Sequence, residues 1–273
     1  MFRMSLRNAM AHRNLLYLLS LKELRTRYKK SVLGWAWSLL NPLSQMLIFT
    51  VIFTYVFVAQ PLPGDPSGIK SFPIYFLCGL LPWNFFSITT SVAMGNVQGG
   101  AGLIKKVSFP HEHLVFSVLT AQFVTLLIET AILIVALFIA GQNALVWLPV
   151  LLPLYVLWAL FTAGVALALS AFNVFFHDVQ YLWGIVSQVL FYATPVIYFT
   201  QSLPQDTTIG QVLKAIATYG PTGAFITAFH NVLYDGRFPS LALIGYLAVL
   251  AVASFAVGSW IFSRLSPRFA EEM

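Results

Sequence analysis

The chain of 273 residues is 59% hydrophobic and only 9% charged, and its mean hydropathy is +0.81. This composition excludes an ordinary soluble domain, in which roughly 25% of residues are charged, and indicates an integral membrane protein. The net charge of +6 comes mainly from basic residues in the first thirty positions, which are interleaved with leucines and fit membrane topology better than nucleic-acid binding.

Residues 15–43 change from a basic amphipathic segment to an apolar one without an intervening loop. An apolar stripe at helical spacing is formed by Tyr17, Leu21, Leu24 and Tyr28. The candidate interface helix is marked by Lys22, Arg25, Arg27, Tyr28, Lys29 and Lys30. We expect this helix to lie along the membrane surface, within a cytoplasmic segment 1–34. A basic helix that only binds anionic lipid head groups fits the stretch equally well when it is taken alone.

Apolar runs long enough to cross the hydrocarbon core, which takes about 20 residues, occur six times. They cover 35–59, 72–94, 114–140, 147–172, 181–199 and 241–262. Trp35 and Trp37 open the first run, as interfacial anchors do. Several runs are interrupted by prolines, namely Pro42, Pro82, Pro149, Pro153 and Pro195. The sequence therefore predicts an all-α membrane protein with six transmembrane helices in one domain over 35–262. No apolar core with a cleavage site precedes it, so we expect no removable signal peptide.

The distribution of Lys and Arg predicts the orientation. With the N-terminus inside, the inner segments 1–34, 95–113, 173–180 and 263–273 hold twelve basic residues, and the outer segments 60–71, 141–146 and 200–240 hold three. This bias predicts a multi-pass protein with both termini in the cytoplasm, including a cytoplasmic tail at 263–273.

The segment 200–240 is the only long outer connection. Its apolar residues predict two short helices, separated by a turn at Gly220 and Pro221. Only five of its 41 residues are charged or histidine, so we expect these helices to be re-entrant and to dip into the outer leaflet before the last span.

The search for catalytic and metal sites predicts none. The chain has no G-x-x-x-x-G-K-[ST] motif, so we expect no nucleotide site of its own. The cluster Gly95, Gly99, Gly100 and Gly102 is interpreted as flexible backbone rather than a phosphate cradle. His111 and His113, beside Glu112, favour a loop surface over a zinc site. A lone cysteine, Cys78, excludes an intrachain disulfide.

Four residues inside the predicted spans are candidates for a translocation pathway. Glu129 is the one acid deep within a span, where it either is satisfied structurally or lines a path. Phe49, Phe53 and Phe57 recur at i+4 in the first span, and their rings either face lipid or form a sliding surface for sugar rings.

Small residues accumulate in the fourth and sixth predicted spans, at Ala159, Ala163, Gly164 and Ala168 and at Ser254 and Gly258. Because small-xxx-small spacing permits close helix approach, we predict that these stripes are packing seams.

Four stretches together give the sequence a family resemblance. They are RYKKSVLGWAWSLLNPL (27–43), GLLPWNFF (79–86), GLIKKVSFPHEHL (102–114) and FFHDV with YATPVIY (175–179 and 192–198). In this order they resemble the membrane subunit of polysaccharide, O-antigen and teichoic-acid ABC exporters, the ABC type-2 permease family. Its usual pattern has Asn at the position of Gly102 and Arg at that of His111.

The resemblance implies a homodimeric permease of the bacterial plasma (inner) membrane, powered by two copies of a separate ABC ATPase subunit that uses ATP and Mg. The permease itself would bind no cofactor and no nucleic acid, and it would export a lipid-linked glycan. By similarity, the loop 95–113 carries the ATPase-coupling residues Leu103, Ile104, Lys105, Lys106, Phe109, Pro110, His111 and Glu112.

Two other functions remain open at this point. A type-2 permease for a small lipophilic compound or drug would have the same plan. A membrane-embedded glycosyltransferase would need clustered acidic or histidine side chains, and Glu112, Asp178 and Asp235 are scattered in the sequence.

Overall fold

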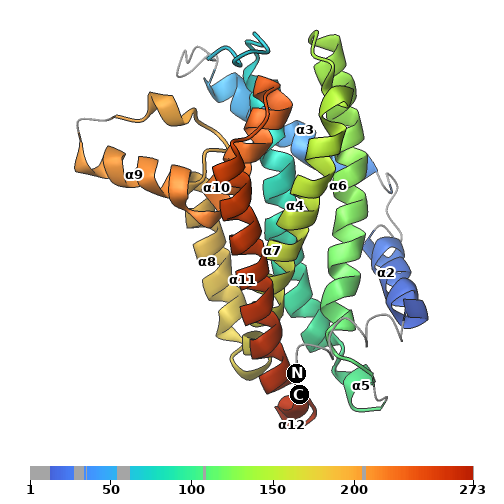
Figure 1. Cartoon of the computed structure of the whole chain (residues 1–273). Helices are drawn as coiled ribbons and strands as arrows, with labels where there is room; N and C mark the ends of the chain where they lie inside the picture. Colours follow the sequence, from blue (N-terminus) through green and yellow to red (C-terminus); the bar gives the residue numbers. More distant parts are fainter. Residues whose placement is uncertain are drawn as a thin grey trace.

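The computed structural model describes residues 13–27, 34, 36–53, 62–106, 109–204 and 207–272, and every regular element in this part of the chain is helical. Four long helices form the bundle in Figure 1: α4 (Phe72–Gly99), α6 (His113–Ile139), α7 (Leu148–Phe175) and α11 (Leu241–Leu265). At about 1.5 Å per residue, each exceeds the roughly 30 Å of a hydrocarbon core. Within the described ranges, four helices are therefore long and apolar enough to cross a membrane.

Shorter helices surround the bundle. They are α2 (Arg13–Arg27), α3 (Ala36–Val51), α5 (Ala101–Ile104), α8 (Asp178–Ala193), α9 (Thr208–Tyr219), α10 (Pro221–His230) and α12 (Phe269–Glu272). Single turns occur at η2 (Ala144–Trp147), η3 (Thr200–Ser202), η4 (Asn231–Asp235) and η5 (Ser266–Arg268). The prediction of two short helices in 200–240 is confirmed by α9 and α10, which meet at Gly220.

The first and fifth predicted spans differ from the helices observed. α3 and α8 have 16 residues each, fewer than the about 20 that a straight span needs. α8 ends at Ala193, and Thr194 is extended because a residue before proline avoids the α-helical conformation. Residues 54–59 of the first predicted span lie outside the described part of the chain. The count of six spans therefore stays a prediction.

The prediction that small residues form packing seams is confirmed at Gly164 and Gly258, where α7 crosses α11. A Cβ atom added to Gly164 would collide with the backbone of Ser254, and one added to Gly258 would collide with the carbonyl of Gly164. Ser254 also donates a hydrogen bond to the carbonyl of Phe161 at 2.9 Å. The two helix backbones can approach this closely only because neither glycine has a side chain.

Buried apolar side chains form two clusters, one toward each end of the bundle. The first surrounds α10, whose Phe225, Ile226 and Phe229 are fully buried among α4, α7 and α11. The second joins α5, the start of α6 and α12, with Phe262 and Phe269 at its centre. We call these the α10 end and the α5 end. α9 extends away from the bundle at the α10 end (Figure 1).

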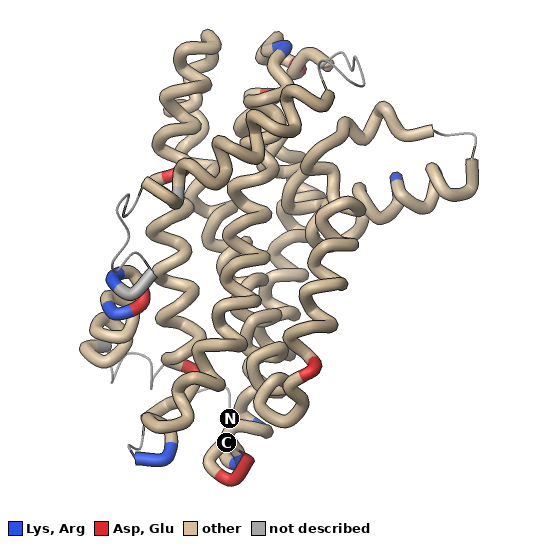
Figure 2. The backbone as a smooth tube through the Cα atoms, turned by 180° about the vertical axis from the view of Figure 1, so that it is seen from behind, with Lys and Arg blue, Asp and Glu red and all other residues tan. Residues whose placement is uncertain are grey.

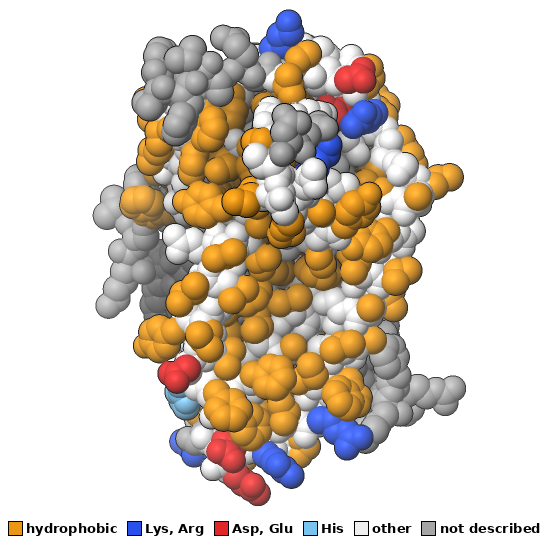
Figure 3. Space-filling model, turned by 90° about the vertical axis from the view of Figure 1, so that its left-hand side faces the viewer, with side chains coloured by type: hydrophobic (Ala, Val, Ile, Leu, Met, Phe, Trp, Pro, Cys, Tyr) orange, Lys and Arg blue, Asp and Glu red, His pale blue; other side chains and the backbone are white. Residues whose placement is uncertain are grey.

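Charged residues are sparse along the bundle. Within α4, α6, α7 and α11, the Asp, Glu, Lys and Arg residues are Glu129 and, in a last turn, Arg264, and the middle of the bundle is uncharged in Figure 2. Figure 3 shows a broad hydrophobic band on the face that carries α8, with charges above and below it. Exposed α8 side chains such as Tyr181, Ile185 and Val189 belong to this face. The pattern is that of a surface in contact with lipid or with another apolar surface.

Candidate functional site

The candidate interface helix is α2, which packs against α6. The face of α2 that packs against the bundle contains Leu19, which is 8% exposed, and Leu15, whereas Tyr17 of the apolar stripe is 65% exposed. Contact with α6 selects this face, which helical spacing alone does not specify. Lys22 and Arg25 are exposed. The side chain of Arg27, and Tyr28, Lys29 and Lys30, lie outside what the structure describes.

The predicted coupling loop begins with the short helix α5. Ile104 is buried and Leu103 is partly buried, and both belong to the apolar cluster of the α5 end. Lys105 and Lys106 follow in an exposed turn. The loop therefore has an apolar inner side that attaches it to the bundle and a basic outer side.

The second half of the loop is tied to the start of α6. Phe109 is 9% exposed and lies in the same cluster. Nδ1 of His113 donates a hydrogen bond to the carbonyl of Pro110 at 3.1 Å, and the backbone N–H of His113 donates to the same carbonyl at 3.0 Å. Asn96 of α4 donates to the carbonyl of Leu114 at 2.9 Å. These bonds join the loop to both helices that it connects.

His111 and Glu112 are half-buried beside the C-terminal segment. The ring of His111 lies between Phe109, at 5.5 Å between centroids, and Phe269, at 6.0 Å. Burial lowers the pKa of His111, against the opposing effect of a hydrogen bond to the backbone at Ser266. Burial raises the pKa of Glu112. The loop thus offers a basic surface at α5, whereas burial near α12 disfavours the charged forms of His111 and Glu112.

Two interpretations of this region were wrong. Gly95 and Gly99 belong to α4 and Gly102 to α5, so the glycine cluster is helical rather than flexible loop. His113 is fully buried, not part of a loop surface, because it starts α6 and packs inward. Within the described ranges, no group of three His, Cys, Asp or Glu side chains is placed to hold a metal.

Two of the three candidate pathway phenylalanines pack between helices. Phe49 lies 5.0 Å from Phe76 of α4 and 6.4 Å from Phe191 of α8, between ring centroids. Phe53 stacks on Phe72 at 4.9 Å. Phe57 is outside the described part of the chain. The rings therefore connect α3 with α4 and α8.

Glu129 lies on α6, where it lines an apolar cavity of about 280 Å³ between α3, α4 and α6. The walls of this cavity include Leu39, Pro42, Met46 and Leu77. Glu129 is half-buried at this position, and Phe49 and Phe53 are not among the residues that line the cavity.

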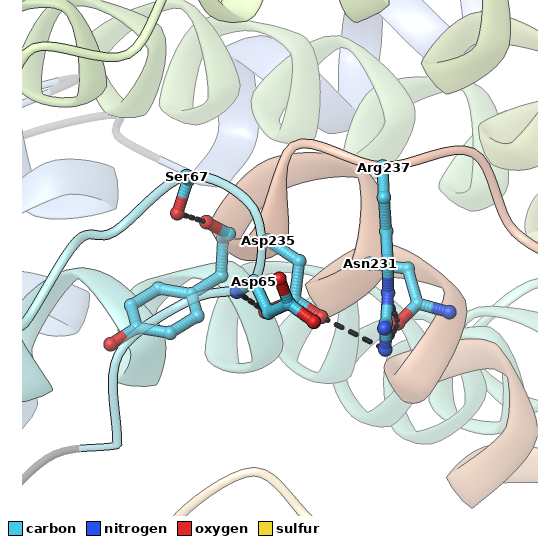
Figure 4. A network of polar contacts seen from close by, with 6 residues as sticks. Asp65, Ser67, Asn231, Asp235 and Arg237 are labelled. Carbon is cyan, nitrogen blue, oxygen red and sulfur yellow. Dashed lines mark hydrogen bonds and ion pairs between the residues drawn. The ribbon is translucent and has the colours of Figure 1, made fainter.

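At the α10 end, polar side chains far apart in sequence come together (Figure 4). The backbone N–H of Ser67 donates to the carbonyl of Asp235 at 2.9 Å, and its hydroxyl donates to the carbonyl of Tyr234 at 2.6 Å. Arg237 donates to Oδ1 of Asn231 at 2.9 Å and pairs with Asp235 at 3.1 Å. These contacts tie the connection before α4 to η4.

Comparison with known proteins decides the family. Residues 14–213 match the ABC-2 type transporter family. The chain belongs to this family. Among its relatives, the O-antigen export system permease protein RfbA of Myxococcus xanthus is 30% identical over 263 residues, or 96% of each chain. RfbA of Klebsiella pneumoniae is 28% identical over 94% of each chain. The polysialic acid transport protein KpsM of Escherichia coli is 22% identical over 88% of this chain and 89% of the relative.

Sequence reasoning missed two parts of this ABC-2 transporter. Phe269 was interpreted only as part of a cytoplasmic tail, although an aromatic residue after Pro267 was a signal that the tail packs. The network of Ser67, Asn231 and Asp235 has no sequence signal, because its members are brought together only by the packing of α10.

Proposed function

We propose that this ABC-2 chain is the membrane permease subunit of an ATP-driven exporter that moves a lipid-linked polysaccharide from the cytoplasm to the outer face of the bacterial plasma membrane. The observation that carries the proposal is its similarity over nearly its whole length to permeases named for O-antigen export. A relative named for polysialic acid transport supports the same class of cargo. These names do not favour the alternative of a small lipophilic compound.

In the proposed complex, two copies of this chain associate with two copies of a separate ABC ATPase, and the ATPase binds ATP and Mg. The α5 end is the proposed contact for that ATPase. Lys105 and Lys106 are exposed there, and Ile104 and Phe109 anchor the loop in a buried cluster. A movement of the ATPase against the loop would therefore be transmitted to α4, α6 and α11 through packed side chains.

The proposed topology has six spans over 35–262, with segments 1–34 and 263–273 and loop 95–113 in the cytoplasm. Segment 200–240 is outside, and α9 with α10 forms the re-entrant part. The burial of α10 among α4, α7 and α11 supports this, as does the excess of basic residues in the inner segments.

Thiol labelling tests this topology. In a Cys78→Ser background, Lys22→Cys and Thr208→Cys each place one thiol at an exposed position. An impermeant reagent added to intact cells should label only Thr208→Cys, and both variants should react after permeabilisation. Labelling of Lys22→Cys in intact cells would reverse the orientation.

The proposed pathway includes the rings of Phe49, Phe53 and Phe57. Replacing Phe49 and Phe53 with Leu keeps helix propensity and hydrophobicity but removes flat surfaces for sugar rings. Export per permease in the membrane should fall, with a small loss of stability from the lost contacts with Phe72 and Phe76. Unchanged export would remove these rings from the pathway.

Deleting the gene tests the function itself. Cells without this permease should lose one surface polysaccharide and accumulate the corresponding lipid-linked polymer in the cytoplasm. Re-expression of the chain should restore surface delivery. Normal surface polysaccharide in the deletion strain, with no polymer accumulated inside, would contradict the proposed cargo.

A further inference from the structure

A cavity of about 310 Å³ lies at the α10 end, beside the network of Figure 4. It is lined by four segments that are distant in sequence: residues 62–65, the first turn of α4, the turn at η3, and α10 with η4. Its polar walls are formed by Asp65, Gln201, Thr227, Asn231, Asp235 and Arg237. The volume is at the lower end of the roughly 300–1,000 Å³ of small-molecule sites, which suits one or two sugar rings.

The floor of the cavity is formed by aromatic side chains that several contacts hold in place. The ring of Tyr75 lies between those of Phe199 and His230, with centroids at 3.9 and 4.0 Å, and its hydroxyl donates to the carbonyl of Tyr198 at 2.8 Å. The hydroxyl of Tyr234 is within 2.7 and 2.8 Å of the carbonyls of Leu62 and Ile69. A binding site built on fixed side chains loses little entropy when a ligand enters.

The polar walls offer both donors and acceptors. The guanidinium of Arg237 is held by Asn231 and Asp235, yet its side chain is 47% exposed and keeps donors free to reach a ligand. Asp65 and Gln201 are exposed, and Thr227 is half-buried. A sugar hydroxyl both donates and accepts hydrogen bonds, so a mixed set of carboxylate, amide, hydroxyl and guanidinium groups matches it.

The charge of the cavity restricts the ligand further. Two carboxylates, Asp65 and Asp235, face one guanidinium, that of Arg237, so the lining has a net charge of −1. An acidic sugar would be repelled by this charge, whereas a neutral one would not. A divalent cation is disfavoured, because Arg237 already occupies a carboxylate oxygen of Asp235 at 3.1 Å.

We propose that this cavity is a binding site for a neutral glycosyl unit of the exported polymer. The inference rests on the proposed function, which supplies the glycan, and on the proposed topology, which puts the α10 end outside. The site would hold the sugar that has just emerged and so oppose its return into the pathway.

Binding of neutral trisaccharides of mannose, galactose and N-acetylglucosamine to the full-length chain in lipid nanodiscs tests the proposal, with saturation-transfer NMR as the readout. At least one of them should give a saturable signal. Thr227→Leu fills the cavity without touching the network and should weaken that signal about tenfold or more. Thr208→Leu makes the same change at an exposed position of α9 and should leave it unchanged. A signal from none of the three sugars, or one that Thr227→Leu leaves intact, would overturn the site.

An acidic trisaccharide tests the preference of the cavity for a neutral ligand. Trigalacturonate should bind the wild-type chain more weakly than the neutral sugar, and Asp65→Asn, which removes one negative charge, should narrow that difference. Equal or tighter binding of trigalacturonate by the wild type would overturn the preference for a neutral sugar. The gene-deletion assay keeps the two proposals apart: if surface polysaccharide depends on the chain but no sugar binds, the site is wrong and the function stands.

Discussion

The α10 end and the α5 end belong to the same four-helix bundle, but they are closed in different ways. At the α10 end a helix is inserted among α4, α7 and α11, and polar contacts of Ser67, Asn231 and Arg237 join the surrounding segments beside a cavity. At the α5 end the segments meet through apolar side chains such as Phe109 and Phe269. Lys105 and Lys106 are exposed on the outer side of the loop. A polar closure suits contact with a hydrated ligand, whereas a packed apolar one suits the transmission of movement.

The two ends also differ in their response to pH. Burial raises the pKa of Asp235 at the α10 end, so folding favours its protonated form and stability is lost as pH rises through the folded-state pKa. Burial lowers the pKa of His111 at the α5 end, so folding favours its neutral form. The contribution of this neutral ring to the stability of the fold is complete above the ordinary pKa of about 6.5 and is lost as pH falls below it. Acidification therefore acts on these two groups in opposite directions.

The largest effect should come from the seam that both ends share. Gly258→Leu would force α7 and α11 apart, because the side chain would meet the backbone of Gly164. We expect little folded protein in the membrane, since backbone offers no room to relax. Gly245→Leu is the control on the same helix, where the added side chain meets open space. The yield of protein that stays folded in detergent measures the difference between the two variants. Equal yields would show that the fold does not depend on the close contact between α7 and α11.

The next largest effect should appear at the α5 end. Phe109→Ala removes a buried ring from the cluster that holds the coupling loop, at a cost of about 3 kcal/mol if the loop stays in place. Export should fall strongly while the chain still inserts. Phe176→Ala deletes a ring that is 67% exposed and should have little effect on either property. Normal export by Phe109→Ala would exclude this loop from coupling.

A smaller effect is expected from the polar closure at the α10 end. Asn231→Ala removes the acceptor that holds Arg237, at a cost of roughly 1–3 kcal/mol for a bond to a charged group. Asn143→Ala, at an exposed position, serves as the control. Thermal unfolding of Asn231→Ala, of Arg237→Ala and of the double variant would give the coupling energy between the two side chains. Fully additive changes would show that the two side chains do not stabilise each other.

The smallest effect concerns protonation of His111. Between about pH 7.5 and about pH 6, the unfolding temperature of the wild type should fall, because the unfolded chain takes up a proton that the folded α5 end disfavours. His111→Phe keeps an aromatic ring against Phe269 and should show a smaller fall. The difference between the two curves removes the contribution of Glu112, whose raised pKa acts in the opposite direction at lower pH. Parallel curves would contradict the role of His111.

Sequence alone determined the features that depend on composition and on local pattern. Hydropathy predicts the long helices α4, α6, α7 and α11, and the small residues Gly164 and Gly258 predict a close helix contact on α7 and another on α11. Turn residues at Gly220 and Pro221 separate α9 from α10 as expected. These predictions succeed because length, apolarity and turn chemistry act within a few neighbouring residues.

Only the tertiary structure decided which faces are buried and which distant residues meet. Spacing alone did not distinguish the Leu15 and Leu19 face of α2 from the Tyr17 stripe, because contact with α6 makes that choice. The packing of Phe269 under the coupling loop, and the contact of Ser67 with Asp235 across 168 positions of sequence, likewise follow from how the helices associate. Such contacts are long-range, and the residues that form them have no local pattern that marks them as partners.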